Sequence, residues 1–112
     1  MHRTNENSQQ WRNGDSGVKY LGRGPHIDWG VVKFLPGETL GAHLHNAVEE
    51  TFYFSQGAPL MIIDSVEFRV EPGDCFRVEP GEVHNIINDT GHPVTAVFIK
   101  APFDPDDKVA VK

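Results

Sequence analysis

The residues with the clearest capacity for chemistry are two histidines and a glutamate in residues 37–57, GETLGAHLHNAVEETFYFSQG. One residue separates His43 from His45, so on an extended strand both side chains point to the same face. If the chain turns at residues 46–48 and returns as a second strand, Glu50 is carried back towards this pair. Each of the three groups offers a lone pair, and such a set is typical of the ligands of a divalent metal ion.

A second segment, residues 73–88, could supply a fourth ligand. Its sequence, GDCFRVEPGEVHNIIN, combines a short strand, a turn at Pro80 and Gly81, and His84 at the start of another strand. If that strand faces the first pair, His84 completes the set. A His-x-His pair alone is common on protein surfaces, but the full spacing with its bracketing glycines is much less expected by chance.

Both segments resemble the paired motifs of the cupin superfamily, a group of small β-barrels. The matching positions are Gly37, His43, His45, Glu50 and Gly57 in the first motif, and Gly73, Gly81, His84 and Asn88 in the second. One departure is Glu79, which stands where the second motif usually has its first proline and so changes a turn residue without affecting a ligand. The resemblance covers about residues 30–100, and it implies a double-stranded β-helix, or jelly-roll barrel.

The choice of carboxylate in the first motif has one alternative. Glu49 precedes Glu50 and, by the alternation of a strand, points to the opposite face. The six residues between Glu50 and Gly57 favour Glu50. The predicted ligands of one divalent transition metal are therefore His43, His45, Glu50 and His84.

The segments that must position these ligands are short strands separated by Gly and Pro turns, with no helical period, which indicates an all-β barrel or sandwich. Strands are expected at residues 18–21, 27–35, 39–45, 49–56, 58–63, 66–70, 75–78, 84–88 and 94–99. Residues 39–45 and 49–56 are expected to pair as a hairpin that carries three ligands. The polar residues 1–16 are expected to form a flexible N-terminal arm, and residues 17–112 a single domain.

Chain length and net charge limit the number of domains and the classes of binding partner. A chain of 112 residues has room for one core, and its net charge of −6 and pI of about 5.4 argue against binding of nucleic acid or anionic membranes. No apolar run approaches about 18 residues, and the N-terminus has no signal-peptide pattern, so a cytoplasmic location is expected. The single Cys75 agrees with a reducing compartment.

Several aromatic and polar side chains are candidates for the wall of a ligand pocket. The residues expected to line a small-molecule pocket are Phe34, Phe52, Phe54, Asn88 and Phe98, although plain core is the leading interpretation of Phe52 and Phe54.

Apolar outer positions predict a homodimer, and they are Val31, Leu35, Leu40 and Leu44. Lys100 shares the parity of Phe98 and is a possible catalytic group, with a solvated surface lysine as the leading interpretation. The acidic tail after residue 101 is expected to be a surface strap with solvated acids.

Three imidazoles and one carboxylate leave an octahedral ion two open positions for water, substrate or dioxygen. The ligand set suits Fe, Mn, Ni, Co, Cu or Zn. We expect a metal-dependent enzyme acting on a small oxygen-rich substrate by oxidation, decarboxylation or isomerisation, all of which the resembled family performs. The alternatives are a non-catalytic module that binds a sugar or organic acid, and a purely structural metal site.

Overall fold

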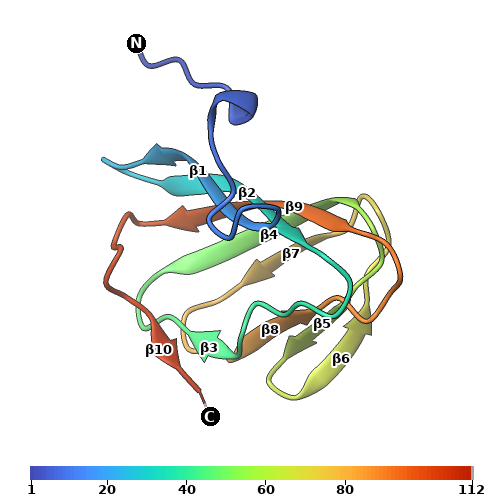
Figure 1. The fold of residues 1–112 in the computed structure, drawn as a ribbon. Coiled ribbons are helices and arrows are strands. Elements are labelled where there is room, and N and C mark those ends of the chain that lie inside the picture. Colours follow the sequence, from blue (N-terminus) through green and yellow to red (C-terminus); the bar gives the residue numbers. More distant parts are fainter. Residues whose placement is uncertain (112) are drawn as a thin grey trace.

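The computed structural model describes residues 1–111 and shows two antiparallel sheets that face each other (Figure 1). The last residue of the predicted domain, Lys112, lies outside the described residues. The elements are the 3-10 turn η1 (Glu6–Ser8), β1 (Gly17–Arg23), β2 (Asp28–Phe34), β3 (His43–Leu44), β4 (Glu49–Gln56), β5 (Leu60–Ile63), β6 (Val66–Arg69), β7 (Cys75–Val78), β8 (His84–Ile87), β9 (Val94–Ala101) and β10 (Val109–Ala110). The predicted all-β, double-stranded β-helix architecture is confirmed.

The two sheets differ in strand length, and this difference shapes the site. One sheet has the order β1-β2-β9-β4-β7 and contains the long strands, whereas the other has the order β10-β3-β8-β5-β6 and is built from strands of two to four residues. In the described part of the chain, no helix is long and apolar enough to cross a membrane.

The hydrophobic core fills the space between the sheets and follows the two-residue period of the strands. On β4, Phe52 and Phe54 are buried while Tyr53 between them is 46% exposed, and on β9 Ala96 and Phe98 are buried. The same period turns Glu50 inward on β4. A carboxylate therefore enters the barrel because its strand must bury the phenylalanines that follow it.

The predicted hairpin of residues 39–45 and 49–56 is wrong. β3 pairs with β8 and β10, while β4 pairs with β7 and β9, so the two segments lie in different sheets. The loop at residues 46–48 crosses from one sheet to the other instead of reversing within one. The predicted ligands of the first motif consequently face each other across the barrel interior and not along one ribbon.

Part of the N-terminal arm, with Glu6 and Trp11, lies against the outer face of β1 and β2 (Figure 1). The Nζ of Lys19 donates a hydrogen bond of 2.9 Å to the carbonyl of Glu6 and lies 4.2 Å from the centre of the Trp11 ring. Beside it in the sheet, Val31 is only 7% exposed. The flexibility of the arm stays a prediction.

Two of the four apolar residues that led to the homodimer prediction are not exposed on the outside of the barrel. Val31 is buried within its own chain, and Leu40 packs against the core and lines the internal cavity. The alternation of a strand fails at Leu40 because residues 39–42 are almost entirely irregular, with the bridge between Thr39 and Ile87 as their one ladder contact to β8. The homodimer itself stays a prediction.

Candidate metal centre

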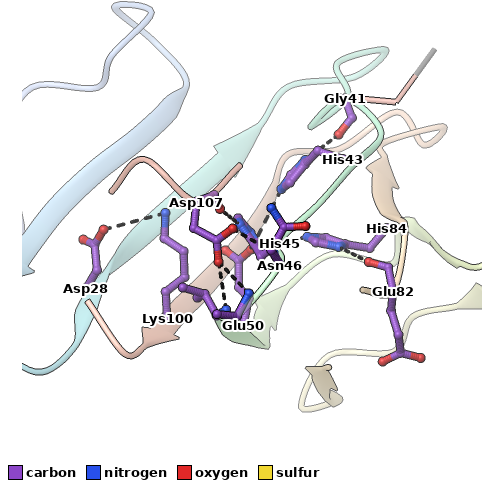
Figure 2. A network of polar contacts seen from close by, with 12 residues as sticks. Asp28, Gly41, His43, His45, Asn46, Glu50, Glu82, His84, Lys100 and Asp107 are labelled. Atoms are coloured by element: carbon purple, nitrogen blue, oxygen red, sulfur yellow. Dashed lines mark hydrogen bonds and ion pairs between the residues drawn. The ribbon is translucent and has the colours of Figure 1, made fainter. Parts of the chain in front are cut away.

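Four side chains that are far apart in sequence converge inside the barrel (Figure 2). His43 on β3, His45 just after it, Glu50 on β4 and His84 on β8 are between 1% and 6% exposed. Their nearest ligand atoms all lie within 4.8 Å of one another. His43 and His84 are direct neighbours in the ladder between β3 and β8. Glu49, the alternative carboxylate, is half-buried and lies outside this cluster.

One oxygen of Glu50 lies at the centre of the cluster. Its Oε1 is 3.0 Å from the Nε2 of His45, 3.3 Å from the Nε2 of His84 and 4.0 Å from the Nε2 of His43. The carboxylate therefore faces three imidazole nitrogens that come from the opposite sheet.

Hydrogen bonds at the other ring nitrogen fix the tautomer of each imidazole. In all three histidines the Nδ1 faces a backbone carbonyl, which can only accept, so Nδ1 must carry the proton. The neutral ring then presents the lone pair of Nε2 to the interior. The accepting carbonyls are those of Gly41 for His43 at 2.8 Å, Asp107 for His45, and Glu82 for His84 at 3.1 Å.

The donor set fits a divalent cation. Three Nε2 lone pairs and a carboxylate would oppose one another unless a proton or a cation lay between them. Burial lowers the pKa of His43 to about 4, which keeps its ring neutral. The pKa of His45 is raised. Burial by itself would lower it, but the contacts with Glu50 and with the Asp107 carbonyl together outweigh burial. A proton shared between His45 and Glu50 would relieve this opposition for only two of the four groups, whereas a divalent cation would bind the lone pairs of all four at once.

The carboxylate is ready to bind a cation. Burial alone would raise the pKa of Glu50, but its contacts with the imidazoles of His45 and His84 and the nearby positive charge of Lys100 lower it to about 2. Glu50 is therefore ionised at neutral pH and needs no deprotonation before it can act as a ligand.

The cluster borders a cavity of about 310 Å³. His43, His45 and Glu50 line this cavity, whereas the side chain of His84 is fully buried behind them. Among the predicted pocket residues, Phe34, Phe52 and Phe98 lie on its wall. A bound cation would thus have protein on one side and open space on the other.

The structure places two predicted pocket residues elsewhere. Phe54 is fully buried in the core, with its ring 6.0 Å from that of Phe76, because the cavity ends at Phe52. Asn88 is also fully buried, and its amide donates to the carbonyls of Phe34 and His92 at 2.9 and 2.8 Å. Asn88 ties the end of β8 to neighbouring backbone, and its side chain does not line the cavity.

Lys100 lies on the cavity wall and not on the solvated surface. Its side chain is 20% exposed, and its Nζ is 3.8 Å from the Oδ2 of Asp28. The ammonium group also lies 5.7 and 5.5 Å from the ring centres of Tyr20 and Phe98. The parity shared with Phe98 is the sequence signal that identifies this position, and it proves more informative than the general preference of lysine for solvent.

Asp107, in the acidic tail, is the residue near the cluster that the sequence did not single out. Its carboxylate accepts hydrogen bonds from the backbone amides of Asn46, Ala47 and Val48, at 2.7, 2.8 and 2.9 Å. These bonds lower its pKa. The expectation of solvated acids is wrong at this position, because the tail returns as β10 along β3 and places Asp107 under the crossing loop. No local sequence pattern indicates this contact.

Comparison with known proteins agrees with this geometry. A family model described as the cupin domain matches residues 30–100. A search of curated proteins found no match. Among solved structures, an uncharacterised protein with a double-stranded β-helix domain from Klebsiella pneumoniae has a TM-score of 0.85 and 18% identity, with 100% of this chain and 98% of that chain covered.

Two further solved structures are of proteins with more specific names. KdgF from Halomonas sp. has a TM-score of 0.84 and 19% identity, with 95% of this chain and 97% of that chain covered. A putative sugar phosphate isomerase from Acidithiobacillus ferrooxidans has a TM-score of 0.72 and 23% identity, with 80% of this chain and 60% of that chain covered. At these identities the similarity establishes the fold.

Proposed function

Because this chain belongs to the cupin family, we propose that it is a metal-dependent enzyme acting on a small, oxygen-rich organic acid. The observation that carries the proposal is the cavity of about 310 Å³, which opens onto three of the four candidate ligands. A purely structural site would be enclosed by protein on all sides. Here a small molecule in the cavity could reach the ion directly.

The residues around the cavity have distinct roles in this proposal. His43, His45, Glu50 and His84 would hold the metal, which when bound would act as a Lewis acid on a chelated substrate oxygen. The aromatic wall of Phe34, Phe52 and Phe98 lowers the local polarity and so strengthens polar interactions inside the cavity.

Lys100 gives the proposal its substrate class. Its ammonium group lies on the cavity wall, and its positive charge acts on Glu50 and His45. Arg12 and Lys108 also line the cavity, as do the acidic Glu38, Asp104 and Asp107. The positive charges that act on the cluster itself are those of Lys100 and Lys108. A carboxylate at one end of the substrate would pair with Lys100 while hydroxyl or carbonyl oxygens at the other end face the metal.

Isomerisation is the reaction to test first among the three that the sequence suggests. Two solved structures of this fold are of proteins described as sugar phosphate isomerases, one of them as putative. A Lewis acid that polarises a carbonyl makes the neighbouring C–H more acidic, which is the step that such isomerisations require.

The experiment compares an anionic probe with its neutral analogue. Malate and malamide are titrated into the cobalt-loaded protein, and the visible spectrum reports ligands that reach the metal. We expect malate to bind more tightly than malamide, and Lys100→Met to weaken malate by about tenfold or more while malamide is unaffected. Lys19→Met is the matched control, because Lys19 lies on the outer face of the sheet.

The outcomes of this titration test the open coordination positions and the role of Lys100 separately. A spectrum unchanged by both probes would contradict the open coordination positions, and equal weakening by both lysine variants would contradict the role of Lys100. A second stage screens the metal-loaded protein for isomerisation of acids that carry a hydroxyl next to a carbonyl, a reaction in which the two groups exchange places without any net change in oxidation state. Tight binding without turnover would turn the proposal into the binding-module alternative.

A further inference from the structure

We propose that Asp107 is a positioning residue for the metal ligand His45, a role that rests on the metal centre proposed above. Asp107 contacts the ligand through its backbone and the loop after the ligand through its side chain (Figure 2). It therefore couples the C-terminal segment, residues 102–111, to the geometry of the metal site.

The three histidines differ in how their Nδ1 partner is supplied. The carbonyls of Gly41 and Glu82 lie only two residues from the rings of His43 and His84, so the local chain provides them. The carbonyl that holds His45 comes from Asp107, which is 62 residues away. The tautomer and orientation of His45 are thus the only ones in the cluster that depend on a distant segment being in place.

The carboxylate of Asp107 controls the loop that links the two sheets. Three consecutive amides, those of residues 46–48, donate to its two oxygens. This loop begins at His45 on one side of the barrel and leads to Glu50 on the other. By satisfying the loop amides, Asp107 fixes the path between two ligands that belong to opposite sheets.

Other contacts hold the C-terminal segment independently of the Asp107 side chain. Val109 and Ala110 pair with β3, and the amide of Val111 donates to the carbonyl of Ala42 at 3.0 Å. At the other end, the amide of Phe103 donates to the carbonyl of His26 at 2.9 Å. Substitution of the Asp107 side chain should therefore leave the carbonyl of Asp107 in place but release the loop at residues 46–48, so that the His45 ring next to this loop can shift relative to that carbonyl.

The test compares Asp107→Asn with Asp106→Asn in the full chain. Both variants lose the same charge from neighbouring positions, but Asp106 has no side-chain contact to the loop or to the cluster among the described residues. In Asp107→Asn the new NH₂ group must face a loop amide or turn away, so one or more of the three hydrogen bonds is lost. We expect zinc affinity, measured by competition with a coloured chelator, to fall by about 10- to 100-fold.

A second readout reports the His45 ring itself. Two-bond ¹H–¹⁵N NMR of the metal-free protein at alkaline pH distinguishes the two neutral tautomers of each histidine. We expect one Nδ1–H tautomer for His45 in the wild type and in Asp106→Asn, and a mixture of both tautomers in Asp107→Asn. A contact that only stabilised the fold would lower the melting temperature without changing this tautomer.

The proposal is overturned if Asp107→Asn binds zinc within about twofold of Asp106→Asn and keeps a single Nδ1–H tautomer at His45. If Asp107→Asn does not fold, Asp107→Glu is compared with Asp106→Glu by the same two readouts, and the same equality overturns it. Failure of the wild type to bind any metal would instead contradict the proposed function, and the tautomer measurement would still decide the role of Asp107.

Discussion

Replacement of His84 by alanine should abolish most metal binding while leaving the barrel folded. His84 lies behind the other ligands with a fully buried side chain, and its ring centre is 4.3 Å from that of His43. Its backbone pairs with His43 on one side and with Ile63 on the other. Those ladder contacts do not involve the imidazole, so the substitution removes a ligand and leaves the strand in its sheet.

The magnitude follows from the number of ligands. Structural zinc sites with four ligands contribute roughly 10–16 kcal/mol of binding free energy, so one ligand accounts for about 3 kcal/mol, or about 100-fold in Kd. Zinc at 100 times the wild-type Kd stabilises the folded state by about 2.7 kcal/mol. For a domain of this size that corresponds to a rise in melting temperature of roughly 10 °C.

In the variant, the same zinc concentration would only equal the new Kd. The stabilisation then falls to about 0.4 kcal/mol, which is a shift of about 2 °C. The assay is the melting temperature with and without zinc, which separates the metal contribution from any change in the metal-free fold. His26→Ala is the control, because His26 is exposed and lies outside the cluster. A full zinc-induced shift in His84→Ala would refute the assignment of His84 as a ligand.

Two further predictions concern the relation between the core and the metal centre. Phe54→Ala should lower the free energy of unfolding by about 3–5 kcal/mol in urea titrations and leave zinc affinity unchanged, because Phe54 is fully buried away from the cavity. Tyr53→Ala, at the adjacent exposed position, should cost no more than about 0.5 kcal/mol, and equal costs would contradict the assigned core. Removal of the metal by a chelator should lower the melting temperature only by the amount that zinc had raised it. The circular dichroism spectrum of the barrel should be retained. Complete unfolding on chelation would favour a structural metal site.

The cluster of candidate ligands could be predicted from sequence because its information is local. The spacing of His43, His45 and Glu50 from their flanking glycines identified the first motif, and His84 followed from the second. Strand parity likewise placed Glu50 and Phe52 on one face of β4, as the structure has them. A period of two residues is a property of the extended backbone and needs no tertiary information.

The path of the chain between the ligands could not be predicted in the same way. A loop of three residues after His45 is compatible with a hairpin and with a crossing between sheets, and long-range partners decide between them. The carboxylate of Asp107, about 60 residues away, supports the crossing that occurs. At Lys100 the local pattern was sufficient and the general rule was misleading. Strand parity indicates an inward side chain, as the structure has it, whereas the usual preference of lysine for solvent predicts an exposed one.

The central claim is that the cluster of His43, His45, Glu50 and His84 binds one metal ion that keeps coordination positions open to the cavity. The most direct measurement is elemental analysis of the untagged protein, purified without chelator, combined with water-exchange spectroscopy of the metal that is found. We predict about one equivalent of a divalent transition metal per chain, with exchangeable water bound to it. A protein that stays metal-free when metal is supplied, or that holds zinc with no exchangeable water, would contradict the claim.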